Sequence, residues 1–365
     1  AIGTALYFLP VKTRVPLKFG AETVTEVTCA RVRVRVVDRG GKTAEGWGET
    51  PLSTQWVWPS ASPLAARAEA LRQFSNQLAE AWARFPGCGH PMEIGEDFQH
   101  EVLAELLKRY NARHRTNAEP MPWLAALVCC SAFDLAVHDA FGQLLERPVY
   151  STYNGKFMNR DLGEFLEASS SFSFAGKFPQ EFLVANSASR LPAWHLVGGL
   201  DLLGASELRG DEPDDGYPVL LPGWIRRDGL KCLKVKLRGT DARWDFERMV
   251  KVGDIALAHD VEHLSADFNC TVTDPAYVVE ILERLRRERL RLFERLLYVE
   301  QPFPYELEKH QIDVHALAAI KPLFLDESAH DWRLVRLGRN LGWNGVALKT
   351  CKTQTGAMLT ACWAR

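Results

Sequence analysis

The chain has 365 residues, which is more than one ordinary hydrophobic core holds, so we expect two domains or one large barrel with an appendage. Hydrophobic residues make up 47% and charged residues 25% of the chain, as is typical of a globular protein. A formal net charge of −2 gives no basic surface for nucleic acid. No unbroken apolar run approaches 18 residues, so we expect no membrane span.

The compartment is indicated by the N-terminus and the cysteines. The first residues lack the basic start, apolar centre and small-residue cleavage site of a signal peptide. Eight cysteines are scattered along the chain and form no CxxC pair. This pattern is typical of reduced, mostly buried thiols, and we expect a cytoplasmic protein.

The N-terminal part reads as β structure followed by helices. Residues 28–37 alternate apolar and polar side chains, as a half-buried strand does, and a second strand-like run leads to residues 46–49. A loop rich in Trp, Ser and Pro follows over 51–63. Helical spacing then appears over 64–85, 97–110 and 123–145, the last apolar nearly all round and therefore expected between two layers.

From about residue 230, short apolar runs alternate with longer helical runs such as 244–257 and 274–293. Alternating strands and helices with short loops predict a parallel sheet or a β/α barrel. The predicted strands are residues 231–237, 263–267, 296–300, 322–326 and 345–349.

Three of these strands end in an acid, namely Asp267, Glu300 and Asp326. Catalytic groups of a β/α barrel stand at the C-terminal strand ends, so these carboxylates should meet at one mouth. Carboxylate oxygens are the ligands that Mg²⁺ prefers, which predicts a magnesium site. The alternative is that each acid caps the next helix or pairs with a surface lysine.

Lysines accompany the acids. Lys234 and Lys236 are two apart, so they share one face of a strand, and Lys349 ends the last apolar run. A lysine face on an exposed edge strand is the alternative reading. Lys352, three residues later, competes with Lys349 for the same role.

These motifs resemble the enolase superfamily, specifically its muconate lactonizing enzyme subgroup. The resemblance is to mandelate racemase/muconate lactonizing enzyme-like and dipeptide epimerase-like proteins. Gly46-Trp47-Gly48-Glu49 is similar to the GxGE turn of that family's capping domain, and residues 132–155 are similar to the helix leading to its barrel. The resemblance implies an α/β protein, with an α+β capping domain over residues 1–155 and a (β/α) barrel of the modified TIM type over residues 156–365. It is weakest over 156–225, where we place the first barrel strand at 191–199.

The resemblance also implies roles for single residues. Asp267, Glu300 and Asp326 would bind Mg²⁺, which would hold a substrate carboxylate and stabilise the enediolate formed when the α-proton leaves. Lys236 would be the base on one face and Lys349 on the other, while Lys234 would stabilise the developing charge. Burial, the metal and the clustered lysines would lower the pKa of the base. The side chains that would support the ligands are Asn269 and Glu327.

Three further residues are candidates for substrate binding. Trp56 and Trp58 lie in the loop after the GxGE motif, which covers the active site in the family, although ordinary packing within the capping domain explains them equally well. His195 lies in the predicted first barrel strand, where a core histidine with satisfied hydrogen bonds is the alternative.

The resemblance implies a racemase or epimerase of amino-acid derivatives or dipeptides, an isomerase acting on a small carboxylate substrate. Cycloisomerisation and β-elimination by the same lysines are alternatives, as is a Schiff-base aldolase. Only 16 residues follow Lys349, so we expect the barrel to be truncated after strand six, which leaves an inactive truncated homologue as a further alternative. A homo-oligomer is consistent with this sequence.

Overall fold

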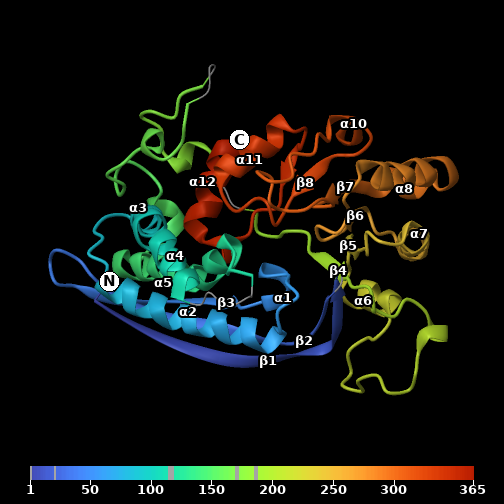
Figure 1. The fold of residues 1–365 in the computed structure, drawn as a ribbon, viewed down its shortest axis with the longest axis horizontal. Coiled ribbons are helices and arrows are strands. Elements are labelled where there is room, and N and C mark those ends of the chain that lie inside the picture. Colours follow the sequence, from blue (N-terminus) through green and yellow to red (C-terminus); the bar gives the residue numbers. More distant parts are fainter. Residues whose placement is uncertain (1, 20–21, 114–118, 169–171, 185–187) are drawn as a thin grey trace.

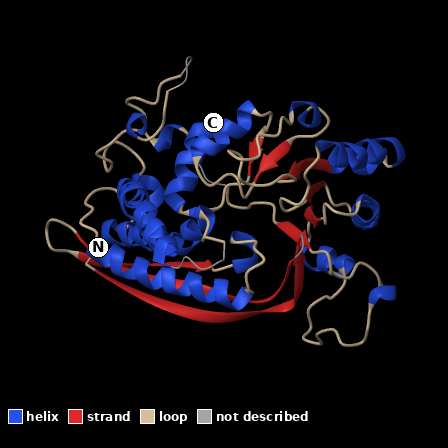
Figure 2. Ribbon diagram, in the orientation of Figure 1, coloured by secondary structure: helices blue, strands red, loops and turns tan. Residues whose placement is uncertain are grey.

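The computed structural model describes residues 2–19, 22–113, 119–168, 172–184 and 188–365. It contains two sheets, one antiparallel and one parallel, that lie in separate parts of the molecule (Figures 1 and 2). The antiparallel sheet and its helices come from the N-terminal half of the chain. The parallel sheet comes from the C-terminal half, and the fold class predicted from the sequence is confirmed in these two parts.

The N-terminal sheet has the order β1-β2-β3, and all its pairs are antiparallel. Its strands are β1 Gly3–Phe19, β2 Glu22–Val37 and β3 Thr43–Pro51. The first two form a long hairpin that curves beneath the N-terminal helices and ends beside the parallel sheet (Figure 1). This hairpin therefore brings one end of the N-terminal sheet next to the parallel sheet.

The motif Gly46-Trp47-Gly48-Glu49 lies within strand β3 and not in a turn, which corrects the reading taken from the family pattern. Its glycines face helix α5, Trp123–Leu145, at very close range. A Cβ at Gly46 would lie 2.0 Å from the Ala140 nitrogen, and one at Gly48 would lie 2.1 Å from the Ala132 oxygen. The motif is therefore a packing device that lets the sheet and the helix approach each other.

Helix α5 is the centre of the N-terminal part. It packs against β2, β3 and the long helix α2, Leu64–Arg84, and most of its side chains are buried. By length and composition alone it could cross a membrane, although polar residues interrupt its apolar sequence. The remaining helices of this part are α1 Thr54–Val57, α3 Pro91–Asp97, the π-helix η1 Phe98–Leu103 and α4 Ala104–Arg113.

The second sheet has the order β4-β5-β6-β7-β8-β9, and every described pair is parallel. Its strands are β4 Trp194–Val197, β5 Cys232–Lys236, β6 His263–Asp267, β7 Leu296–Glu300, β8 Leu323–Leu325 and β9 Gly345–Val346. Each predicted strand overlaps one of these, including the first barrel strand expected at 191–199.

Helices lie between these strands along the chain and cover the sheet, except the last one, which follows β9 and packs against α3, α5 and α11 (Figure 2). They are α6 Leu221–Asp228, α7 Ala242–Ala258, α8 Pro275–Glu288, α9 Leu290–Arg295, α10 His315–Ala318, α11 Trp332–Asn340 and α12 Gln354–Ala364. Short 3₁₀ helices occur at Val149–Thr152, Leu162–Glu164, Pro179–Glu181, Ala205–Glu207 and Thr350–Lys352. One hydrophobic core joins the sheet to α6, α7, α8, α9 and α11.

The parallel sheet does not close into a barrel, because β4 and β9 are its two edges and do not pair with each other in the described part of the chain. The division of the chain at residue 155 stays a prediction. All eight cysteines are free, and five of them are buried.

Candidate functional site

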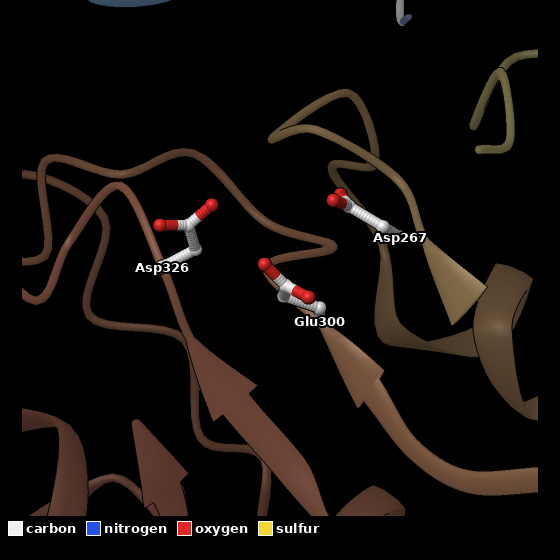
Figure 3. A group of neighbouring side chains, drawn as sticks. All are labelled: Asp267, Glu300 and Asp326. Atoms are coloured by element: carbon white, nitrogen blue, oxygen red, sulfur yellow. The ribbon is translucent and has the colours of Figure 1, made fainter. Parts of the chain in front are cut away.

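Three buried carboxylates meet at the C-terminal edge of the parallel sheet. Asp267 ends β6, Glu300 ends β7, and Asp326 follows β8 directly. One oxygen from each lies within 4.8 Å of the others, and at most 1% of each residue is exposed. Figure 3 shows the three side chains projecting from adjacent strand ends towards a common space. The geometry is that of a site that could hold a metal ion.

Other acids cap the neighbouring helices. Asp241 accepts a hydrogen bond from the Trp244 N–H at the start of α7, and Asp274 and Asp331 cap α8 and α11 in the same way. The three carboxylates of the site are therefore free of the capping role that the sequence left open.

Two lysines of β5 contact this group from one side. Lys234 Nζ lies 2.9 Å from Asp267 Oδ2 and 2.5 Å from Glu300 Oε1. Lys236 Nζ donates to Asp267 Oδ2 at 2.6 Å. Both side chains are largely buried and point to the carboxylate face, so the alternative of an exposed lysine edge does not apply.

Two more lysines contact Asp326 from the other side. Lys349 donates to Asp326 Oδ2, and its side chain remains 32% exposed. Lys352 is buried and donates to the backbone oxygen of Asp326, to Asp326 Oδ1 at 3.2 Å and to the Ala329 oxygen at 3.5 Å. The sequence did not predict that both lysines would reach the same acid.

The charges shift one another's pKa values. Burial would raise the pKa of Asp267, but Lys236 and Lys234 outweigh it and hold the pKa below the ordinary value. Burial, and then the charge of Asp267, raises the pKa of Glu300 to about 8. Burial would lower the pKa of Lys349, but Asp326 outweighs it and raises the pKa. The sequence analysis expected a lowered pKa for the lysine base. For Lys349 the structure gives the opposite direction, because the acid Asp326 is its partner.

Asn269 and Glu327 lie against each other beside the carboxylates. Asn269 Nδ2 donates to Glu327 Oε1 at 3.4 Å, and the Asn269 N–H donates to Asp267 Oδ1 at 2.9 Å. Among the described residues, Asn269 Oδ1 and Glu327 Oε2 are buried without a hydrogen-bond partner. Buried acceptors beside three clustered carboxylates fit a hydrated divalent cation, whose waters would donate to them.

The three candidates for substrate binding lie in different surroundings. Trp56 Nε1 donates to Glu327 Oε1 at 2.7 Å, so this side chain reaches the site from α1. Trp58 is buried in the hydrophobic core of the N-terminal part. His195 pairs in register with Leu233 of β5, on the sheet face opposite to that of Lys234 and Lys236, and its ring lies near Trp224 of α6. His195 therefore lies on the face that packs against α6, and its part in substrate binding stays a prediction.

Gln301 is a residue that the sequence analysis did not single out. Its Oε1 accepts from the Asp326 and Ser328 N–H groups, and its Nε2 donates to the Phe303 oxygen and to Ser328 Oγ. The side chain thus fixes the backbone that carries Asp326. The sequence did contain a signal for this role, because a polar residue directly after Glu300, at a buried strand end, needs a hydrogen-bond partner nearby.

No model of a known protein family matches the chain, and a search of curated proteins found no match. Solved structures do match over almost the whole chain. The dipeptide epimerase from Cytophaga hutchinsonii, solved with Mg and D-Ala-L-Val, is 17% identical with a TM-score of 0.59, over 99% of this chain and 75% of that one.

Two further structures show the same likeness. The L-Ala-D/L-Glu epimerase from Bacillus subtilis is 16% identical with a TM-score of 0.60, over 98% of this chain and 77% of that one. The muconate lactonizing enzyme from Pseudomonas fluorescens is 16% identical with a TM-score of 0.55, over 99% of this chain and 76% of that one. The chain therefore has the fold that these dipeptide epimerases and this muconate lactonizing enzyme share.

Proposed function

We propose that this protein is a Mg²⁺-dependent racemase or epimerase that removes the α-proton of a small carboxylate substrate, such as an amino-acid derivative or a dipeptide. The observation that carries the proposal is the order of charges along the sheet edge. Lys236 contacts Asp267 at one end, Lys349 contacts Asp326 at the other, and Glu300 lies on the strand between these acids. Two amines thus flank one candidate cation site.

Each residue has a role that follows from its place. Asp267, Glu300 and Asp326 would hold Mg²⁺, which when bound supplies a Lewis acid for the substrate carboxylate. The proton leaves the α-carbon for Nζ of one lysine, and Nζ of the other returns a proton to the opposite face. Lys234, against Asp267 and Glu300, would donate to the negative charge that develops on the substrate.

The contacts favour Lys349 over Lys352 as the second acid–base group. Lys352 is engaged by three acceptors, two of them backbone oxygens, which is typical of a lysine that holds a loop in place. Lys349 has Asp326 as its acid partner and is partly open to solvent. Asn269 and Glu327 would support the ligands by holding their oxygens and the waters around the cation.

Exchange of the α-proton with solvent tests the proposal. The protein is incubated with Mg²⁺ in D₂O with dipeptides and N-acyl amino acids of both configurations, and ¹H NMR follows deuterium entry and the appearance of the other isomer. We expect exchange and isomerisation by the wild type. Lys236→Ala and Lys349→Ala should each stop isomerisation, while each keeps exchange from one isomer only.

The matched control is Lys251→Ala, which changes an exposed lysine of α7 and should leave both rates unchanged. Full isomerisation by both single variants would contradict the assignment of two bases. Loss of the substrate signal without isomerisation, with a lactone or an alkene as product, would show that the same site performs cycloisomerisation or elimination.

A further inference from the structure

Two aromatic side chains of the N-terminal part face the two lysines that flank the carboxylates. Lys236 Nζ lies over the Phe19 ring at 5.7 Å from its centroid, and Lys349 Nζ lies over the Trp56 ring at 4.8 Å. Both distances are within the range of cation–π contacts. In the described part of the chain Lys234 has no such ring, although it contacts the same acids. Lys352 Nζ also lies over the Trp56 ring, but farther away, at 5.9 Å from its centroid. The nearest lysine to each ring is therefore one of the two proposed proton carriers.

Phe19 is held in place by the loop that follows β4. It is the last residue of β1 and is buried. The Gly199 N–H donates to the Lys18 oxygen at 2.8 Å, directly before Phe19. A Cβ at Gly199 would lie 3.1 Å from the Lys18 side chain, so the absence of a side chain at this position permits the close approach. The end of the hairpin is thereby fixed to the parallel sheet that carries Lys236.

Trp56 is held by its own polar atom. Its Nε1 donates to Glu327 Oε1 at 2.7 Å, and Glu327 follows Asp326, the acid partner of Lys349. Thr54, Gln55 and Val57 of the same short helix are buried, which anchors the backbone on both sides of the ring. The ring plane is therefore set by a contact within the site itself.

We propose that Phe19 and Trp56 are positioning residues, each for one lysine: Phe19 for Lys236 and Trp56 for Lys349. A lysine side chain has a flexible four-carbon stem, so a ring on one side of its ammonium group restricts the positions that the group visits. The consequence is stereochemical. This inference rests on the proposed function, because each lysine serves one isomer of the substrate there.

The first measurement needs no substrate and no metal. An amine-reactive reagent labels the metal-free protein, and peptide mass mapping gives the labelling rate of each lysine. In Trp56→Leu the rate at Lys349 should rise about tenfold, as expected when a ring–cation contact is lost, while Lys236 and Lys234 keep their rates. Phe19→Leu should raise the rate at Lys236 alone.

The second measurement follows deuterium entry from each isomer separately. Trp56→Leu should slow exchange from the isomer that depends on Lys349 about tenfold more than exchange from the other isomer, and Phe19→Leu should do the reverse. Lys236→Ala and Lys349→Ala identify which isomer depends on which lysine. Trp56→Phe keeps a ring but loses the Nε1 donor, so it should bring the ratio between the isomers back towards the wild-type value without fully restoring it. This variant also serves when Trp56→Leu is too unstable to assay.

Trp47→Leu is the control, since Trp47 is an exposed tryptophan of β3 that stacks on Tyr7 away from the site. Equal slowing of both isomers, or labelling rates that do not change at the matching lysine, would overturn the inference and leave the rings as packing or substrate cover. If the wild type exchanges no substrate proton, the proposed function fails, while the labelling rates still decide whether each ring restrains its lysine.

Discussion

Four lysines share one buried site, and their contacts separate their roles. Lys234 bridges two of the acids, whereas Lys352 holds backbone oxygens around Asp326. Lys236 and Lys349 each contact one acid, and each is the lysine nearest to one aromatic ring, since Lys352 lies farther from the Trp56 ring than Lys349 does. A group that must gain and lose a proton needs few fixed acceptors, so the two lysines that each contact a single carboxylate among the described residues, without the backbone acceptors of Lys352, are the ones suited to proton transfer.

The distinction between Lys349 and Lys352 predicts different effects of two similar substitutions. Lys352→Met removes a buried charge that satisfies Asp326, so the free energy of unfolding should fall by about 3–5 kcal/mol. Lys349→Met changes a partly exposed side chain and should cost clearly less while abolishing isomerisation. Urea unfolding of the two variants at the same pH provides the measurement. Equal losses of stability would contradict a structural role for Lys352 that Lys349 does not share.

Magnesium binding can be tested without any substrate. Mg²⁺ at about 100 times its dissociation constant should stabilise the fold by about 2.7 kcal/mol, because the ion binds the folded site only. Glu300→Gln keeps the shape of the side chain but removes one charged ligand, so the stabilisation by Mg²⁺ should largely disappear. Thermal unfolding with and without Mg²⁺ measures both values, with Glu294→Gln on α9 as the control. An unchanged Mg²⁺ response in Glu300→Gln would remove this residue from the ligand set.

The residues of the site divide into those that sequence could place and those it could not. Asp267, Glu300 and Asp326 were predictable because charge at the end of a buried apolar run needs a reason. The sheet face on which His195 lies was not predictable, because it depends on the register between β4 and β5. The contact between the Phe19 ring and Lys236 was not predictable either, because a hairpin from the other half of the chain brings the ring there.

At the scale of elements, helices α5 and α12 are joined by a buried polar chain. Thr355 donates to Asp134 through both its N–H and its Oγ1, at 2.9 and 2.7 Å. His138 contacts Thr355 Oγ1 at 3.0 Å through Nε2 and Tyr153 at 2.8 Å through Nδ1. Gln354 donates to the Tyr153 hydroxyl at 2.8 Å. This network ties the last helix, close to Lys349, to the central helix of the N-terminal part.

The network predicts how acid acts on the fold. Burial lowers the pKa of His138 to about 3, below its ordinary value of 6.5. Between these values the unfolded chain binds the proton more readily, so the stability that neutral His138 supports is lost as the pH falls through this range. The His138→Gln variant has no imidazole at this position, so it has no stability of this kind to lose. The destabilisation caused by His138→Gln should therefore shrink by about 1.4 kcal/mol per pH unit below pH 6.5.

Urea unfolding at pH 7, 6 and 5 checks this prediction, because all other titrating groups are common to both proteins. The control is His315→Gln, which makes the same substitution at an exposed histidine on α10, outside the buried network. A constant cost of His138→Gln across these pH values would contradict a neutral buried imidazole.

Strands and helices were predictable where their own periodicity decides them. Residues 263–267 and 296–300 were placed at their observed bounds, because a short apolar run between two helical runs is a clear pattern. The 17-residue strand β1 was not delimited, since its polar and apolar residues follow no regular alternation. The role of Gly46 and Gly48 required the partner helix α5 to be known.

At the scale of the whole molecule, the parallel sheet has two open edges. Within the described ranges, strands β4 and β9 each have a neighbour on one side only. A half-buried aromatic stack lies on the carboxylate face of the sheet, where Trp194 of β4, Tyr298 of β7 and Phe324 of β8 follow one another at 5.5 and 4.2 Å. Unpaired backbone groups at an edge next to apolar side chains are a template for further strand pairing.

We therefore predict that this 365-residue chain associates or unfolds readily in dilute solution. Each large apolar side chain left in water forgoes about 1.5–3 kcal/mol, so a handful of them rivals the roughly 5–15 kcal/mol that stabilises a whole fold. Sedimentation should show a mass that grows with concentration, and thermal unfolding should be broad at low concentration. Val346→Lys, which puts a charge on the edge strand β9, should reduce association. A monomer that melts cooperatively at all concentrations and isomerises substrate would show that these edges are protected in another way.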